Sequence, residues 1–246
     1  MLLLLCLFAG DRLIFQPPAG VFEKPNEHFS EIPSARGDRI SIYYREPAGG
    51  MPILLWSHGN AEDLRHTSQL VDQFHERGFG VLVYDYPGYG LSSGSPDEEG
   101  CYQAIEAAYQ HLTSMGHDPK RIILTGQSVG SGPTCWLASQ KEIAGVMLIS
   151  PFISAFRTVT RVPLFPNDRF HNLDRVKEFK YPLLIIHGTK DRVISHWHGE
   201  KLLGLAASPE KELVSIEDAG HNNLYAVGGV KLVNTIENFA LKVYPR

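Results

Sequence analysis

A serine between two glycines is the strongest chemical signal in this sequence. Ser128 is the centre of the pentapeptide G-Q-S-V-G, residues 126–130, which follows the apolar run 121–125. An apolar helical pattern over 129–140 comes directly after the serine. In a strand–turn–helix of this kind the serine lies on a sharp turn with its hydroxyl exposed, and the glycines let the strand and the helix pack closely. We therefore expect Ser128 to be a nucleophile.

A serine hydroxyl is a weak nucleophile and needs a base, which in turn needs a group that orients it. Where the serine lies on such a turn, the acid and then the histidine follow it in the chain. Asp191 comes just after the apolar run 182–186, and His221 comes just after the run 212–216. The carboxyl ends of parallel strands meet at one edge of a sheet, where open α/β sheets build their sites. This placement predicts His221 as the base and Asp191 as the acid that orients it.

Other acids and histidines are weaker candidates for these roles. Asp218 lies three residues before the base and follows the wrong strand, whereas Asp85 precedes a Tyr-Pro-Gly-Tyr-Gly segment that is typical of a structural turn. His187 ends a strand, where a packed and hydrogen-bonded histidine is the expected role. His196 and His198 form an H-x-H pair with no evident third ligand, so no metal site is predicted. The predicted chemistry needs no metal and no organic cofactor.

Two backbone amides are expected to complete the site. Acyl transfer builds negative charge on a carbonyl oxygen, and each preorganised N–H group there is worth about 3 kcal/mol. One donor is expected to be the N–H of Val129, the residue after the nucleophile. The other is expected in the loop 57–61 after the first apolar run, with the N–H of Asn60 as first choice and that of Ala61 as second. His58 is expected to hold this loop by hydrogen bonding.

Short apolar runs place these motifs at strand ends. Each run is of strand length and none alternates polar with apolar residues, which is typical of strands covered on both faces of a parallel sheet. Helical patterns lie between the runs, and this alternation predicts right-handed crossovers and a mostly parallel, doubly wound α/β sheet. Upstream segments rich in β-branched and aromatic residues predict an antiparallel lead-in. The expected strands are 52–56, 80–84, 121–125, 145–149, 182–186 and 212–216, the lead-in is 13–16, 27–32 and 39–45, and the expected helices are 63–77, 96–115, 129–140, 198–207 and 230–243.

Composition excludes several classes of protein. The chain has 246 residues, 43% hydrophobic and 20% charged, which is ordinary for a folded domain and argues against disorder. A formal net charge of −4 gives no electrostatic reason to expect nucleic acid as a partner. The three cysteines, Cys6, Cys101 and Cys135, form no CxxC motif and argue against a disulfide framework or a structural zinc site. The sequence leaves the oligomeric state open.

The N-terminal residues 1–9, MLLLLCLFA, are almost wholly apolar. They are too few to span a bilayer, which needs about 20 residues, and without a basic n-region they are no ordinary signal peptide. Two interpretations remain: the tail of a membrane anchor, with Cys6 as a candidate for acylation, or a short apolar segment packed on the domain. The compartment is accordingly open between membrane-associated and cytoplasmic. We expect residues 1–10 to form this segment and residues 11–246 to form one domain.

Five segments around the expected site form a recognisable set. The segments SHGNAEDL, DYPGYGLSSG, GQSVGSGP, HGTKDRVIS and DAGHNN resemble those of the bud-emergence-protein-like α/β hydrolases, a family that includes membrane-bound protein depalmitoylases. The resemblance runs from about Asp11 to near the C-terminus and implies the α/β-hydrolase fold, with Ser128, Asp191 and His221 as the catalytic triad. It also implies an N-terminal hydrophobic anchor and a small-molecule or acyl-protein ester substrate, because the family contains carboxylesterase-like, lipase-like and acyl-protein-thioesterase-like enzymes.

The cap expected over the site is short. Only residues 151–181 separate two of the expected strands, which is too few for a large multi-helix lid. Some of its large apolar side chains must belong to the core, and the remainder could line an acyl pocket, since small-molecule sites are mostly apolar. These side chains are Phe152, Phe156, Val162, Leu164, Phe165 and Phe170.

Together these observations predict a serine hydrolase that cleaves carboxylic esters or thioesters through an acyl-enzyme. A serine peptidase of the same fold is the first alternative, and it would need an acid to hold a free amine. Glu62, Asp63 and Asp168 are the candidates for that acid. A non-catalytic binding or scaffold protein is the second alternative, because fold alone does not fix function. Such proteins usually lose a member of the triad, and the sequence contains all three.

Overall fold

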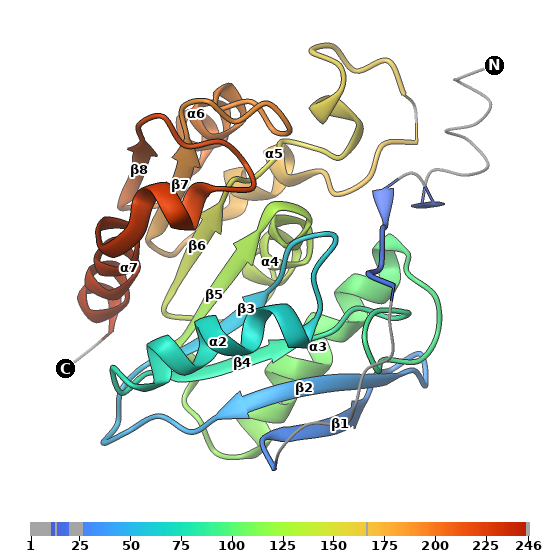
Figure 1. Cartoon of the computed structure of the whole chain (residues 1–246), viewed down its shortest axis with the longest axis vertical. Helices are drawn as coiled ribbons and strands as arrows, with labels where there is room; N and C mark the ends of the chain where they lie inside the picture. Colours follow the sequence, from blue (N-terminus) through green and yellow to red (C-terminus); the bar gives the residue numbers. More distant parts are fainter. Residues whose placement is uncertain (1–10, 13, 20–26, 166, 245–246) are drawn as a thin grey trace.

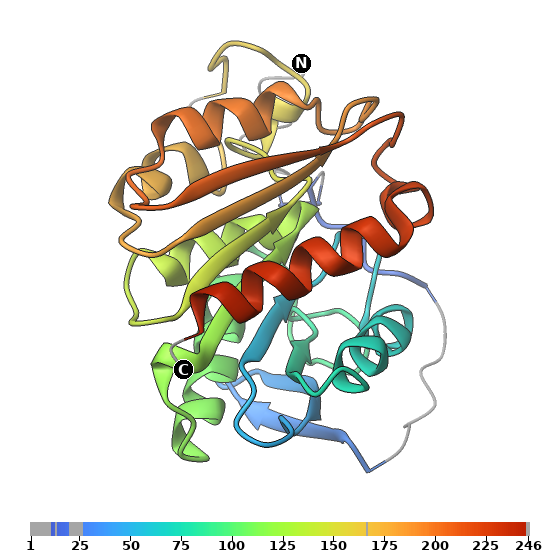
Figure 2. The same cartoon turned by 90° about the vertical axis from the view of Figure 1, so that its left-hand side faces the viewer.

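A single twisted sheet organises the molecule. The computed structural model describes residues 11–12, 14–19, 27–165 and 167–244, so the apolar segment 1–9 with Cys6 lies outside the described residues. Eight strands form the sheet in the order β1-β2-β4-β3-β5-β6-β7-β8, with helices on both faces (Figures 1 and 2). Strand β2 is antiparallel to both of its neighbours, and every other neighbouring pair is parallel.

Strands and helices alternate along the chain, as the apolar runs predict. The strands are β1 (Phe29–Pro33), β2 (Arg39–Arg45), β3 (Ile53–Ser57), β4 (Gly80–Tyr84), β5 (Ile122–Gln127), β6 (Gly145–Ile149), β7 (Leu183–Gly188) and β8 (Lys211–Ile216). The helices are α2 (Leu64–His75), α3 (Glu98–Ser114), α4 (Ser131–Ala138), α5 (Asn172–Arg175), α6 (Trp197–Leu205) and α7 (Leu224–Val243).

Burial on both faces explains why the apolar runs form strands. Every residue of β3, β4 and β6 is buried. Helices α2 and α7 pack on one face, in a core that includes Trp56 and Phe74. Helices α3, α4 and α6 pack on the other face, in a core that includes Ile105 and Leu202. The predicted mostly parallel, doubly wound sheet of the α/β-hydrolase fold, with an antiparallel N-terminal edge, is therefore confirmed.

The first described residues differ from the expectation. A strand was predicted at 13–16; Leu13 lies outside the described residues, and residues 14–16 form no strand. The Phe15 N–H donates instead to the Asp11 carbonyl at 2.8 Å, which closes a helical turn. Two prolines follow at 17 and 18, and proline has no N–H to donate to a strand ladder. Phe15 is buried and meets the ring of Phe170 edge-on at 6.1 Å, so the segment packs on the domain.

The last helix begins earlier than predicted. Helix α7 starts at Leu224, whereas the expected helix starts at residue 230. Gly229 interrupts it with a φ of 46° and a ψ of −133°, a conformation that glycine adopts at little steric cost. The sequence pattern indicated only the part of α7 after this break.

Residues 151–181, which we call the cap, join β6 to β7. They contain α5 and two 3₁₀ turns, Phe156–Thr158 and Val176–Glu178. Phe170 is fully buried, and a Cβ on Gly132 of α4 would collide with its ring. Val162 and Leu164 are 54% and 57% exposed. The apolar residues of the cap therefore include both core and surface side chains.

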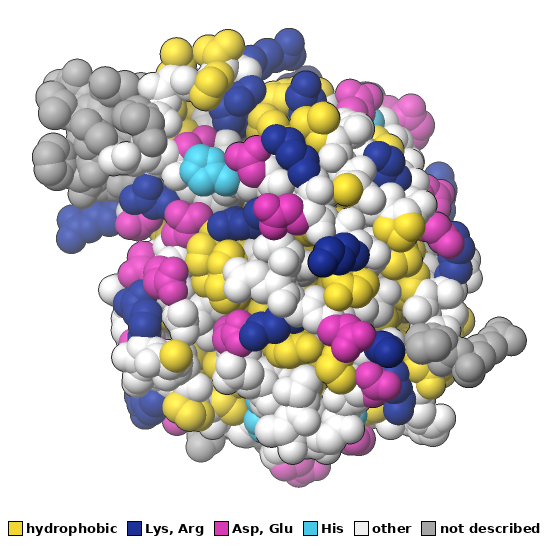
Figure 3. Space-filling model, turned by 180° about the vertical axis from the view of Figure 1, so that it is seen from behind, with side chains coloured by type: hydrophobic (Ala, Val, Ile, Leu, Met, Phe, Trp, Pro, Cys, Tyr) yellow, Lys and Arg dark blue, Asp and Glu magenta, His cyan; other side chains and the backbone are white. Residues whose placement is uncertain are grey.

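The surface opposite the view of Figure 1 carries charges of both signs. Lysine and arginine side chains are interspersed with aspartate and glutamate over this face (Figure 3). Ion pairs in the molecule include Lys141 with Glu106 at 2.7 Å. Charges mixed in this way give little attraction for a polyanion. Among the described residues, no helix has the length and apolar character needed to cross a bilayer.

Candidate active site

The turn that carries Ser128 is sterically constrained. Ser128 follows β5 with a φ of 52°, in the left-handed region that residues with a Cβ rarely adopt. A Cβ on Gly126 would collide with Thr134 of α4, and a Cβ on Gly130 would collide with the Ser57 carbonyl. These close approaches explain why glycine stands on both sides of the serine. Backbone strain of this kind concentrates at functional sites.

The structure brings together the three residues that were predicted to form the triad. His221 Nε2 lies 3.0 Å from Ser128 Oγ, and His221 Nδ1 lies 2.7 Å from Asp191 Oδ2. Ser128 and Asp191 are buried, and the His221 side chain is 14% exposed. A carboxylate only accepts hydrogen bonds, so His221 donates through Nδ1, and its Nε2 accepts from the serine hydroxyl. A general base for the serine requires this tautomer.

Residues 189–194, which we call the Asp191 loop, have partners close in sequence as well as bonds from the N–H groups of Thr189 and Lys190 to the end of β8 and the turn after it. Asp191 Oδ1 accepts from the N–H groups of Val193 and Ile194 at 2.9 and 2.8 Å. His187 is buried beneath the loop, with Nε2 2.8 Å from Ile194 O and 3.5 Å from Asp191 Oδ2. Both of these are acceptors, so Nε2 carries the proton. His187 is therefore packed and hydrogen-bonded, as the sequence predicts.

The Asp191 carboxyl is held in its ionised form. Burial opposes the charge, but contacts with His187 and His221 and the Ile194 N–H outweigh burial and hold the pKa of Asp191 well below its usual range. Hydrogen bonds and positive partners favour the charged form of an acid in this way. Asp191 thus remains a hydrogen-bond acceptor for His221 across the neutral pH range.

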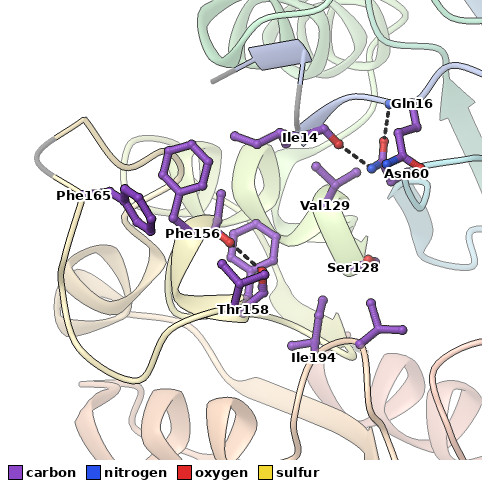
Figure 4. Close-up of a pocket in the computed structure, with 13 residues that line it drawn as sticks. Ile14, Gln16, Asn60, Ser128, Val129, Phe156, Thr158, Phe165 and Ile194 are labelled. Carbon is purple, nitrogen blue, oxygen red and sulfur yellow. Dashed lines mark hydrogen bonds between the residues drawn. The ribbon is translucent and has the colours of Figure 1, made fainter. Parts of the chain in front are cut away.

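Residues 58–61, which we call the Asn60 loop, lie beside Ser128. Asn60, Ser128 and Val129 line one cavity (Figure 4). Among the described residues, the Asn60 N–H has no acceptor. The N–H of Val129 belongs to the first turn of a helical segment, where backbone donors have no partner within the helix. The two residues whose amides were predicted to bind the developing charge thus line the same cavity as the serine.

A buried histidine supports the Asn60 loop. His58 Nδ1 lies 2.8 Å from Gly59 O, and the His58 ring lies 4.4 Å from that of Tyr86. The Tyr86 hydroxyl donates to the His58 carbonyl at 2.7 Å. Asp85, the rival acid, lies 3.4 Å from His58 Nε2 and accepts from the Leu64 N–H at the start of α2. Burial raises the pKa of Asp85. Asp85 and His58 thus support the loop from within the core.

A chain of polar side chains links the Asn60 loop to the nucleophile turn and to α7. Glu62 accepts from the Gly59 N–H at 2.8 Å and from Gln127 Nε2 at 3.2 Å. Tyr225, in the first turn of α7, donates to Gln127 Oε1 at 2.9 Å. Gln127 directly precedes Ser128, so this chain ties three segments that converge on the serine.

An apolar cavity of about 360 Å³ opens beside Ser128 (Figure 4). Aromatic side chains of the cap form one side of it, and an isoleucine of the Asp191 loop forms another. Of the cap residues expected to line an acyl pocket, Phe152, Phe156 and Phe165 do so. The complete lining is Ile14, Gln16, Asn60, Ser128, Val129, Phe152, Ala155, Phe156, Thr158, Val159, Phe165, Val193 and Ile194.

The remaining candidates from the sequence have other partners. Asp218 is 75% exposed and pairs with Lys190 at 2.7 Å, away from His221. His196 Nε2 lies 2.9 Å from Ser215 Oγ, whereas His198 Nδ1 accepts from the Ile153 N–H at 3.2 Å. The two histidines thus have separate partners. In the part of the chain that the structure describes, no cluster of histidine, cysteine and acidic side chains could hold a metal.

Sequence reasoning missed the contribution of residues 14–16 and of Tyr89. Ile14 and Gln16 line the cavity, although a strand was predicted there. Tyr89 donates to Asn60 Oδ1 at 2.7 Å, whereas its Tyr-Pro-Gly-Tyr-Gly segment was interpreted only as a turn. The repeated tyrosine in that segment was the available signal. Residues 14–16 carry no motif that indicates contact with a loop more than 40 positions later.

The sheet order and the strained serine after β5 define the class of protein to which the chain belongs, the α/β hydrolases. Comparison with known proteins assigns the chain to a narrower group. The chain is 38% identical over 205 residues to the human protein named alpha/beta hydrolase domain-containing protein 17B, and the alignment covers 79% of this chain and 69% of that protein. The chain therefore belongs to the alpha/beta hydrolase domain-containing protein 17 family, and it is a hydrolase, as the sequence predicts.

Other comparisons agree with this assignment. The mouse protein named alpha/beta hydrolase domain-containing protein 17C is 38% identical over 201 residues, covering 78% of this chain and 61% of that protein. A family model described as serine aminopeptidase, S33, matches residues 51–166. Among solved structures, a Pyrococcus furiosus esterase is similar with a TM-score of 0.79 at 18% identity, over 94% of this chain and 99% of that one. An esterase from a Rhodococcus species is similar with a TM-score of 0.69 at 17% identity, over 88% and 99%. At such low identity, these two structures support the fold alone.

Proposed function

We propose that this hydrolase cleaves carboxylic esters or thioesters whose acyl group is an apolar chain. One observation carries the proposal: His221 joins Ser128 Oγ, at 3.0 Å, to Asp191, at 2.7 Å, beside an apolar cavity of about 360 Å³. Cavities of roughly 300–1,000 Å³ with a few polar groups are typical of small-molecule sites. The apolar lining suits a hydrocarbon chain, and the carbonyl carbon of the substrate then lies within reach of the serine.

In the proposed acylation step, Ser128 Oγ attacks the carbonyl carbon while its proton passes to His221 Nε2. The carbonyl electron pair moves onto oxygen, and the N–H groups of Asn60 and Val129 stabilise that charge. His221 then gives its proton to the leaving oxygen or sulfur as the bond to carbon breaks. Asp191 remains ionised and stabilises the imidazolium in between. The acyl group is left as an ester on Ser128.

Deacylation repeats these steps with water. His221 takes a proton from water, whose oxygen attacks the acyl carbon and forms a second tetrahedral intermediate. The intermediate collapses as His221 returns the proton to Ser128 Oγ, and the carboxylic acid leaves. Every proton is accounted for between Ser128, His221, water and the leaving group. The sequence resemblance to a family with protein depalmitoylases extends the proposed substrates to acyl-proteins, with the acyl chain in the cavity.

A peptidase that recognises a free amine is a weaker proposal, because the three candidate acids already have partners. Glu62 binds the Gly59 N–H and Gln127. Asp63 is buried at the start of α2, with its carboxylate on Arg65 and His66. Asp168 accepts from Ser154 Oγ at 2.6 Å and from the Phe156 N–H at 2.8 Å. These carboxylates support loops and helix ends rather than an amine site.

The first experiment is labelling with a fluorophosphonate probe, with Ser128→Ala as the matched variant. We expect strong labelling of the wild type and none of Ser128→Ala at equal thermal stability. A p-nitrophenyl ester series from acetyl to dodecanoyl, repeated with the matching S-acyl thioesters, then measures kcat/KM against chain length. We expect kcat/KM to rise at least tenfold from acetyl to octanoyl, since each buried methylene is worth about 0.8 kcal/mol. A preference for acetyl esters, or labelling that survives in Ser128→Ala, contradicts the proposal.

A further inference from the structure

The side chain of Asn60 is held from two directions, although its proposed role belongs to its backbone. Asn60 Nδ2 donates to the Ile14 carbonyl at 2.5 Å, and Asn60 Oδ1 accepts from the Gln16 N–H at 3.0 Å (Figure 4). The Tyr89 hydroxyl donates to the same Oδ1 at 2.7 Å. Both ends of the amide group are thus occupied by protein partners, and none of these bonds is made to a neighbour in sequence.

Tyr89, one of the partners of Asn60, is packed in the core. Tyr89 is fully buried, with its ring 5.7 Å from that of His58 and 5.4 Å from that of Tyr86. Its hydroxyl also accepts from the Gln16 N–H at 3.0 Å. The Gln16 N–H therefore points between two acceptors, and Asn60, Gln16 and Tyr89 form a closed triangle of hydrogen bonds. Closed polar networks of this kind fix the orientation of their members.

Residues 11–12 and 14–16, which we call the strap, are anchored to the cap. Phe15 is buried against Phe170 of the cap. Arg169, the neighbour of Phe170, donates through Nε to Asp11 at 3.1 Å. Ile14 lines the cavity between these anchors and Asn60. The strap therefore connects the cap to the loop that presents the Asn60 N–H to the nucleophile.

We propose that Asn60 is a positioning residue through its side chain. Its hydrogen bonds to the strap and to Tyr89 orient the Asn60 N–H toward the carbonyl oxygen of the group that Ser128 attacks. This inference rests on the proposed acyl-transfer function and adds a residue, Tyr89, and a segment, the strap, that set its rate. A misdirected donor weakens transition-state stabilisation while it leaves the acyl pocket in place. Loss of these hydrogen bonds should therefore lower kcat and leave KM nearly unchanged.

The test compares Asn60→Ala and Tyr89→Phe with Tyr109→Phe in the full chain, with p-nitrophenyl octanoate as substrate. Tyr109 is a matched control because it is buried and its hydroxyl also donates one hydrogen bond, to the Glu142 carbonyl at 2.9 Å, far from the site. We expect kcat to fall about 30-fold in Asn60→Ala and about fivefold in Tyr89→Phe, which is less than the loss of a whole oxyanion donor. KM should stay within about threefold, and Tyr109→Phe should match the wild type.

An alkyl trifluoromethyl ketone supplies a readout that a merely structural role would not move. This inhibitor adds to the serine as a tetrahedral oxyanion, so its affinity should fall by the same factor as kcat/KM in Asn60→Ala and Tyr89→Phe. Folded variants that keep wild-type kcat, or that change KM alone, overturn the inference and leave the proposed function standing. If Asn60→Ala does not fold, Tyr89→Phe decides alone. A wild type that neither labels with fluorophosphonate nor turns over overturns both, and this result is read without any variant.

Discussion

The side chains of Asp191 and Asn60, on the two loops beside Ser128, are held in different ways. The Asp191 carboxylate binds the amides two and three residues ahead, and His187 reaches Ile194 only seven residues away. The start of the same loop is also tied to the end of β8, because the N–H groups of Thr189 and Lys190 donate to carbonyls 27 and 29 positions later. In the Asn60 loop, Gly59 has a near partner in Glu62, but the Asn60 side chain and the His58 carbonyl bond to partners 28 to 46 positions distant, on the strap and on the turn after β4. The Asp191 carboxylate is thus positioned in part by a short stretch of sequence, whereas every printed bond of the Asn60 side chain goes to a distant segment.

This difference has physical consequences for each side. Closing a short loop costs less conformational entropy than joining distant segments, so the Asp191 loop can take its shape once β7 and β8 are paired. The Asn60 loop needs the strap, β3 and the turn after β4 in register together. We therefore expect substitutions on the Asp191 side to act through the identity of one group. Substitutions on the Asn60 side should act by changing how distant segments position the loop.

The largest expected effect is that of Asp191→Asn. The substitution keeps an oxygen for the N–H groups of Val193 and Ile194, so the loop should keep its shape. It presents an amide donor to His221 Nδ1 and so favours the wrong tautomer of the base. We expect kcat for p-nitrophenyl octanoate to fall about 10⁴-fold, with a melting temperature within a few degrees of the wild type. A fall of less than tenfold in a folded variant would mean that another acid orients His221.

The same contrast explains how much of the molecule could be predicted from the sequence. The sheet and the triad were predictable because each depends on local signals: apolar runs of strand length, and Ser128, Asp191 and His221 just after such runs. The strap was not, because its fold depends on Asn60 and Phe170, which lie far away in the chain. The part of α7 before Gly229 was missed because this residue, with non-helical φ and ψ, separates it from the periodic pattern that follows.

Two isoleucines that line the cavity sharpen the comparison, because one belongs to each side. Ile194 of the Asp191 loop is 3% exposed, whereas Ile14 of the strap is only partly buried. We expect Ile194→Ala to destabilise the fold by about 2–4 kcal/mol, as large-to-small core substitutions do, and Ile14→Ala by less than about 1 kcal/mol. Both should raise KM for a decanoyl ester about tenfold, because each removes apolar contact with the acyl chain.

Urea unfolding and ester kinetics on the same preparations test this pair of substitutions. The acetyl ester is the internal control, since its short chain should not reach either side chain. Equal destabilisation by Ile14→Ala and Ile194→Ala would show that the strap is as integral to the core as the Asp191 loop. An unchanged KM for the decanoyl ester in both variants would place the acyl chain elsewhere.

A buried histidine on the Asp191 side should make the stability of the fold depend on pH. His198 accepts from the Ile153 N–H of the cap, and burial, with repulsion from His187 and Arg157, lowers its pKa from 6.5 to about 4. Because the folded pKa is below the unfolded one, this contribution to stability is complete above pH 6.5 and is lost as the pH falls toward 4. Its size is about 2 kcal/mol once screening by solvent is allowed for.

The variant His198→Asn tests this acid sensitivity, because its side-chain oxygen can still accept from the Ile153 N–H while nothing there takes up a proton. We expect its free energy of unfolding to fall less than that of the wild type between pH 7.5 and pH 4.5, by about 2 kcal/mol. Urea unfolding at the two pH values measures the difference. Parallel losses in both proteins would show that His198 does not carry the acid sensitivity.

The smallest expected effect belongs to Tyr86→Phe, and it decides whether the Asn60 loop responds as one unit. The Tyr86 hydroxyl donates to the His58 carbonyl, two positions before Asn60. Its loss leaves one buried carbonyl without its donor, so we expect destabilisation of about 1 kcal/mol. We expect kcat to stay within about twofold of the wild type, because the bonds of Asn60 to Ile14, Gln16 and Tyr89 remain. If kcat instead falls as far as in Tyr89→Phe, the loop responds as one unit. The orientation of the Asn60 N–H then depends on every distant contact of the loop rather than on the bonds of the Asn60 side chain alone.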